Sequence, residues 1–162
     1  MPDVTAHQLR RIRRADAGDI SRMADQERYW FPAALREILR RIDKLNNEDP
    51  EQALLAGVSA LRMVKRIRDA SPDLHALTQA LYASTLRSNG RLQEALTLYK
   101  SALSIKGLSS TGASDVLVKM SVTLVCLGQK HEGLRAVNTA LAQSPTDEVQ
   151  ALAVRAWIQI EA

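Results

Sequence analysis

The sequence predicts an all-α protein, and two observations carry this prediction. Apolar residues recur at steps of three and four, as in Leu35, Ile38, Leu39 and Ile42, which is the spacing of one helix face. No stretch of the sequence shows the strict alternation or the β-branched clustering of a strand. The chain has 162 residues, of which 46% are hydrophobic, and this suits one folded domain with a real core.

Prolines and glycines mark the expected helix ends. Asp49-Pro50-Glu51 and Ser71-Pro72-Asp73 each place a capping residue, a proline and a carboxylate in the order that favours a helix start. Gly90 and Gly128 stand where a helix would stop and turn. The helices are therefore expected at residues 4–15, 19–29, 32–46, 51–69, 73–88, 92–105, 114–127, 130–143 and 147–160.

The composition argues against several classes of protein. Lys and Arg number 22 against 18 Asp and Glu, so the net charge is only +4. A single cysteine excludes a disulfide framework and a multi-thiolate metal cluster, which favours a reducing compartment. The sequence shows no signal-peptide pattern and no apolar run of membrane-spanning length, so we expect a cytoplasmic protein without a membrane partner.

An internal repeat organises the second half of the chain. Segments 76–107 and 114–145 match in chemistry when their turn glycines are aligned. Small residues at equivalent positions would let the two helices of each hairpin approach closely, and these are Ala83 and Ser121 in the first helices and Ala95 and Gly133 in the second.

This pattern resembles the tetratricopeptide repeat (TPR), which combines a small residue in the first helix, a turn glycine and alanines in the second helix. Two departures are the spacing of 38 residues between Gly90 and Gly128, and Gln79 and Leu117 in place of the family's tryptophan. The resemblance implies a right-handed α-solenoid of about three TPR-like hairpins with helical caps at both ends. The expected organisation is a basic N-terminal helical arm or cap at 1–31 and a TPR-like domain at 32–162, made of a degenerate repeat at 32–69, repeats at 73–107 and 114–145, and a capping helix at 147–160.

No residue pattern indicates catalysis, a cofactor or a metal ion. His7, His75 and His131 are isolated in the sequence. The segment from Gly107 to Ser114 imitates a phosphate loop, but it lacks the lysine and a preceding strand, so a flexible linker is the better interpretation. Cys126 has apolar neighbours and is expected to be a small buried or groove residue rather than a nucleophile. We expect a protein that is not an enzyme.

The resemblance implies that the first helices of successive hairpins line a groove. A peptide or helix of a partner protein would bind there, as in an adaptor, a co-chaperone or a secretion-type chaperone. The alternative is that the closing helix or a second copy of the chain, in a homodimer, covers this face. The implied groove residues are Leu77, Ala80, Ser84, Arg87 and Ser88, then Asp115, Val118, Val122, Val125 and Cys126, and Arg36, Arg40, Asp43 and Lys44 from the degenerate copy.

Residues 8–14 hold four arginines, Arg10, Arg11, Arg13 and Arg14. Such a cluster can bind phosphates, which leaves a second function open, a nucleic-acid-associated regulator that uses the solenoid for sensing or dimerisation. The modest net charge favours the other interpretation, a solvated face on a packed cap. Tyr29-Trp30-Phe31 could likewise anchor a partner or pack as part of this cap, and the need to cover a solenoid end favours the cap.

Overall fold

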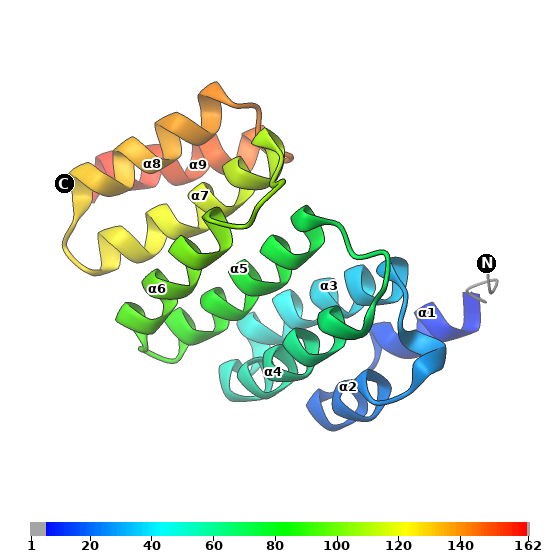
Figure 1. Ribbon diagram of the computed structural model, residues 1–162. Helices are drawn as coiled ribbons and strands as arrows, with labels where there is room; N and C mark the ends of the chain where they lie inside the picture. Colours follow the sequence, from blue (N-terminus) through cyan, green and yellow to red (C-terminus); the bar gives the residue numbers. More distant parts are fainter. Residues whose placement is uncertain (1–5, 162) are drawn as a thin grey trace.

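A computed structural model describes residues 6–161, and all regular structure within them is helical (Figure 1). The prediction of an all-α fold is thus confirmed. The elements are α1 (Ala6–Arg13), α2 (Ala17–Ala24), the 3₁₀ helix η1 (Glu27–Tyr29), α3 (Pro32–Glu48), α4 (Pro50–Arg66), α5 (Pro72–Ser88), α6 (Leu92–Leu103), α7 (Ser110–Cys126), α8 (Lys130–Ala142) and α9 (Glu148–Ile160).

The helices form a chain of hairpins. The pairs α3 and α4, α5 and α6, and α7 and α8 each pack along their length, and α9 packs on α8 and α7. The first helices α3, α5 and α7 also contact one another in succession, while α1 packs on α3 and α2 on α4. Helices α1 and α9 consequently lie at opposite ends of the array (Figure 1). This arrangement confirms a solenoid of helical hairpins with helices at each end.

The two hairpin turns of the repeat have the same geometry. Gly90 and Gly128 both adopt φ 78°, a left-handed conformation that glycine reaches without a steric penalty. In each turn the N–H after the glycine donates to a carbonyl five residues earlier at 2.9 Å, from Arg91 to Leu86 and from Gln129 to Leu124. This is the Schellman arrangement that ends a helix. The alignment of the two repeats at these glycines is therefore confirmed.

The close helix approach predicted from small residues is also present. Ala83, Ala95 and Ser121 are fully buried. A Cβ added to Gly133 of α8 would lie 2.8 Å from Cγ2 of Val125 and 3.0 Å from the carbonyl oxygen of Ser121, both on α7. Glycine at this position thus allows α8 to lie directly against the α7 backbone.

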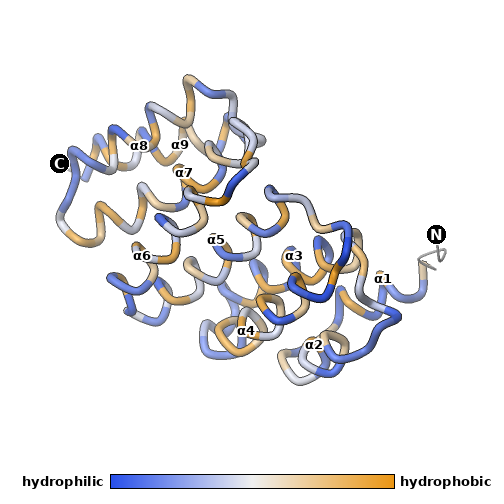
Figure 2. Tube along the Cα trace, viewed as in Figure 1, coloured by the Kyte–Doolittle hydropathy of each residue, from blue (hydrophilic) through white to orange (hydrophobic). Residues whose placement is uncertain are grey.

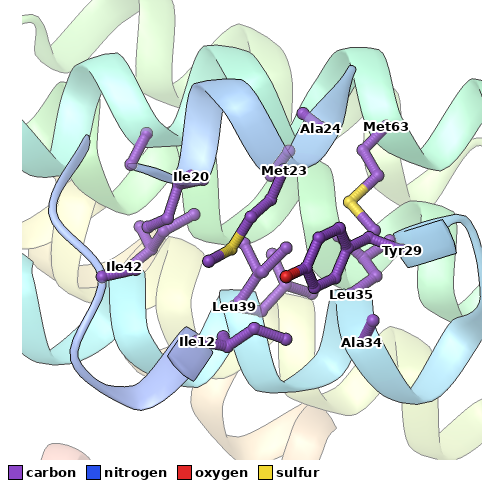
Figure 3. Close-up of a cluster of buried hydrophobic side chains, with 14 of the residues drawn as sticks. Ile12, Ile20, Met23, Ala24, Tyr29, Ala34, Leu35, Leu39, Ile42 and Met63 are labelled. Atoms are coloured by element: carbon purple, nitrogen blue, oxygen red, sulfur yellow. The ribbon is translucent and has the colours of Figure 1, made fainter. Parts of the chain in front are cut away.

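Hydrophobic residues recur along each helix, and many turns are hydrophilic (Figure 2). The core has three buried clusters that follow one another along the solenoid. In the first cluster, Met23 of α2 and Tyr29 of η1 point towards Leu35 and Leu39 of α3 (Figure 3). Trp30 and Phe31 pack against the same cluster, so all three aromatic residues contribute to this end of the core.

Two expected element boundaries were wrong. The helix expected at 19–29 ends at Ala24, and the separate turn η1 follows it. The segment interpreted as a flexible linker is largely helical, because α7 begins at Ser110. The side chain of Ser109 accepts a hydrogen bond from the Gly112 N–H at 2.9 Å and caps this helix start.

Candidate functional site

The first helices of the three hairpins surround a small hollow of about 120 Å³. Its apolar side chains come from α5 and α7, and its polar rim comes from α3, α5, α7 and the segment before α9. We name it the first-helix hollow, and it is lined by Arg36, Asp73, Leu74, Leu77, Ala80, Thr111, Gly112, Asp115, Val116, Lys119 and Thr146.

The two carboxylates of the hollow already have partners. Asp73 of α5 accepts hydrogen bonds from the backbone N–H of Ser109, at 2.9 Å, and from its hydroxyl. Asp115 of α7 does the same for Thr146, whose N–H lies at 2.8 Å and whose hydroxyl lies at 2.6 Å. Asp73 therefore holds the segment before α7, and Asp115 holds the segment before α9. These hydrogen bonds occupy much of the accepting capacity of each carboxylate.

The two cationic side chains of the hollow, in contrast, have no such partners among residues 6–161. Within residues 6–161, the side chains of Arg36 and Lys119 make no hydrogen bond or ion pair. The hydrogen bond between Lys119 and Arg87 of α5 involves the Lys119 backbone carbonyl, which accepts from the Arg87 guanidinium at 3.4 Å. The hollow thus combines an apolar floor with two cationic groups that can still donate hydrogen bonds.

The structure brings four of the predicted groove residues into this hollow, namely Arg36, Leu77, Ala80 and Asp115. Arg40, Asp43 and Lys44 are exposed on α3, where Arg40 pairs with Glu37 at 2.8 Å. Ser88 and Cys126 are exposed at the ends of their helices, and Arg87 is half-buried.

Three other predicted groove residues lie elsewhere. Ser84 is only 4% exposed, and its hydroxyl is 2.8 Å from that of the buried Tyr99. Val118 is 5% exposed and packs in the third cluster with Ile158 of α9. Val125 is half-buried and packs against the same cluster and against Gly133. The structure therefore places Ser84 and Val118 in the core and Val125 at its edge, because α6, α8 and α9 cover the faces on which they lie.

Val122 lies outside the third cluster, to which Val118 belongs and against which Val125 packs. It is half-buried, lies on the same α7 face as Asp115 and Lys119, and is a member of none of the three clusters of described residues. Helix spacing alone does not separate these valines, since steps of three and four residues make them neighbours on α7. The packing of α8 and α9 covers Val118 and Val125 and leaves Val122 at the edge.

A family model described as Tetratrico peptide repeat matches residues 76–160, more than half of the chain. The chain belongs to the tetratricopeptide repeat family. Comparison with curated proteins and with solved structures gave no match. TPR domains serve as scaffolds for protein–protein interaction and are typically not catalytic, so a protein partner is the general expectation for this chain.

Several residues that line the first-helix hollow were not predicted from the sequence. Lys119 could have been found, because it follows Asp115 by four residues on the same helix face. Thr111 and Gly112 were assigned to a linker and so were not considered. No sequence pattern around Thr146 indicates that it lines this hollow, since only the packing of α9 brings it to Asp115.

The four arginines of the N-terminal segment divide into two groups. The Arg13 Nε donates to Oε1 of Glu37 at 2.7 Å, and Glu37 is 7% exposed. This hydrogen bond, with that of Arg40, holds the pKa of Glu37 below its ordinary value despite burial. Arg10, Arg11 and Arg14 are exposed, and their side chains make no hydrogen bond or ion pair among residues 6–161.

Two further properties bear on function. In the part of the chain that the structure describes, no group of three or more His, Cys, Asp or Glu residues could hold a metal ion. None of the helices described combines the length and the apolar content that a membrane crossing needs.

Proposed function

We propose that this TPR protein is a non-enzymatic scaffold that binds a peptide or helix of a partner protein along α3, α5 and α7. The observation that carries the proposal is the first-helix hollow, which joins an apolar floor to two unpaired cations. The role would be that of an adaptor, a co-chaperone or a secretion-type chaperone. The single cysteine favours action in a reducing cytoplasm.

The size of the hollow favours a side chain as its occupant. Sites for small organic ligands usually enclose about 300–1,000 Å³, whereas this hollow measures about 120 Å³. One apolar side chain of the ligand would pack on Leu77 and Val116, which form the floor of the hollow. Acidic groups beside it would meet Arg36 and Lys119, because Asp73 and Asp115 are already engaged. The proposed ligand is therefore an apolar residue flanked by Asp or Glu.

A displayed library of random peptides, selected on the purified protein, tests this chemistry. We expect selected peptides to place acidic residues next to an apolar one. Lys119→Glu should weaken the binding of a selected peptide by about 10-fold or more, since it replaces an attraction by a repulsion in the site. Lys100→Glu, an equal charge change on an exposed residue of α6, is the control. Equal loss in both variants would contradict the proposal.

Val122 and Val118 provide a matched pair of variants on one helix. Val122→Asp should abolish peptide binding and leave the melting temperature nearly unchanged, because a carboxylate there is buried without a partner only in the complex. Val118→Asp should destabilise the free protein strongly, since that site is already core. If Val122→Asp unfolds the protein, or if it binds normally, the α7 face is not a docking surface.

A further inference from the structure

The exposed arginines at the end of α1 share one side of the helix, with Arg10 and Arg11 in its last turn and Arg14 directly after it. Arg10, Arg11 and Arg14 are separated by steps of one, three and four residues, and with His7 and Asp19 they line a second hollow. We call these three arginines the basic face of α1. Their Cβ atoms are about 5–6 Å apart at the steps of three and four. Arg13, on the other side, is used to attach the helix to Glu37.

The negative charge next to the basic face is already compensated. Asp19 accepts a hydrogen bond from Arg22, and this bond is the main reason why the pKa of Asp19 is lowered. It also accepts from the Asp16 N–H at 3.4 Å as part of the cap of α2. The guanidinium groups of the three arginines therefore remain free to donate hydrogen bonds to an anion that is not part of residues 6–161.

The basic face is held on a rigid support. Arg13 bonds to the buried Glu37 on one side, and Arg41 of α3 donates to the Ala15 carbonyl at 2.9 Å just after the helix. Ile12 is fully buried in the first cluster between these two attachments. A ligand therefore meets arginines on an ordered helix, and binding does not have to order the backbone.

The absence of an apolar anchor decides the class of ligand. On α1, Ile12 is buried and Leu9 is half-buried against the core, so no large apolar side chain stands exposed beside the arginines. Protein interfaces depend on buried apolar or aromatic anchors, and interfacial helices insert apolar residues into lipid. A phosphate backbone needs only charge and hydrogen-bond donors, which Arg supplies as a fork.

We propose that the basic face of α1 binds the phosphate backbone of a nucleic acid, without reading its bases. The exposed arginines from Arg10 to Arg14 span about 6 Å along the helix axis. Since each strand of a duplex carries a phosphate every 3.4 Å of axis, the face meets about two or three phosphates. The TPR groove on the first helices lies on other residues, so both ligands can bind to one chain.

Fluorescence anisotropy of a labelled DNA duplex of random sequence tests the proposal with the full chain. At low salt the protein should bind, and log Kobs should fall with log salt with a slope of about −2 to −3. The triple variant Arg10→Gln, Arg11→Gln, Arg14→Gln should bind about 10-fold or more weakly and should lose most of this slope. Its melting temperature should be unchanged because all three side chains are exposed.

Two control variants separate the basic face from the total charge of the protein. Lys100→Gln, Lys106→Gln, Arg135→Gln removes the same charge from exposed sites on other elements, and it should bind like the wild type. Replacing the three arginines by lysine keeps the charge and should keep most of the salt slope. Equal weakening in the first control would overturn the proposal, as would failure of the wild type to bind duplex at low salt.

Two other ligands are tested in the same format. Vesicles with phosphatidylserine should retain less protein than the duplex does at the same salt concentration. Poly-glutamate should compete poorly with the duplex. Preferential binding to the vesicles would identify a membrane surface instead, and preferential binding to poly-glutamate would identify an acidic protein. Either result would overturn the assignment of a nucleic acid.

Discussion

Glu37 accepts hydrogen bonds from two arginines, Arg13 of α1 at 2.7 Å and Arg40 of its own helix at 2.8 Å. A carboxylate that is buried without partners would be costly, so these donors are what makes the charge tolerable at this site. The bond to Arg13 also fastens the N-terminal cap to α3. One residue thus connects charge, packing and the position of the basic face.

We predict that Glu37→Gln lowers the free energy of unfolding by about 1–2 kcal/mol at neutral pH, since both arginines are largely exposed and their charges are screened. The pKa of Glu37 is lowered from 4.5 in the folded protein, so its contribution is complete above pH 4.5 and is lost as the pH falls through the lowered folded pKa. Urea denaturation from neutral to acidic pH should show the two proteins converging. A constant difference would contradict this assignment, and Glu27→Gln is the exposed control.

Ser144 is the residue other than glycine with a left-handed backbone within residues 6–161, at φ 60°. It follows α8, at a place where helices often end with glycine. We predict that Ser144→Gly stabilises the protein by up to about 1 kcal/mol, because strain is relieved. Ser104→Gly should destabilise it slightly, since Ser104 caps α6 with an ordinary right-handed backbone. Thermal melts that rank the two variants in the opposite order would refute the prediction.

At the scale of the element, α9 has two apolar faces. Ala151 and Ile158 point inwards and complete the third cluster with Val118 of α7. Val149 and Ile160 point away and are 77% and 81% exposed, with Leu152 and Trp157 also exposed. The helix therefore closes the core of the last hairpin but leaves an apolar surface of its own.

We predict that Val149→Lys with Ile160→Lys leaves the melting temperature within about 2 °C of the wild type and raises solubility, because an exposed apolar surface promotes association. Ile158→Lys, in the same helix, should instead lower the free energy of unfolding by about 3 kcal/mol or more. Calorimetry and light scattering measure the two effects. Similar melting curves for both variants would show that the inner face of α9 does not pack as described.

At the scale of the whole molecule, the solenoid needs a cover at its first hairpin. Leu35, Ile38 and Ile42 of α3 are fully buried, and the segment from α1 to η1 belongs to the same cluster (Figure 3). Repeat proteins transmit stability between neighbours, so the loss of a terminal unit exposes the apolar face of the next one.

We predict that deletion of residues 1–31 yields a protein that aggregates or binds a hydrophobic dye more strongly than the full chain does. The reason is the exposure of the α3 side chains now covered by Ile12, Ile20 and Tyr29. Size-exclusion chromatography and dye fluorescence measure this. A soluble shortened protein with the denaturation midpoint of the full chain would show that residues 1–31 are a separate arm.

The periodic and local features of this protein could be predicted from its sequence. Helix spacing, proline starts and the turn residues Gly90 and Gly128 depend on neighbours a few positions away, and the structure has them where they were expected. The repeat alignment followed from the same local chemistry, whereas the four predicted residues of the first-helix hollow came from the resemblance to the TPR family. Such features are encoded locally because hydrogen bonds within a helix and its caps span only three to five residues.

Contacts between distant segments decided the rest. Val118 and Val122 stand in the same apolar run, and the packing of α8 and α9 makes the first a core residue while the second stays half-buried. Arg13 and Arg14 are adjacent in sequence, yet the position of Glu37, 24 residues after Arg13, engages one of them and leaves the other exposed. The physical reason is the same in both cases. A pattern shows which residues share a helix face, whereas the partners of that face come from elsewhere in the chain.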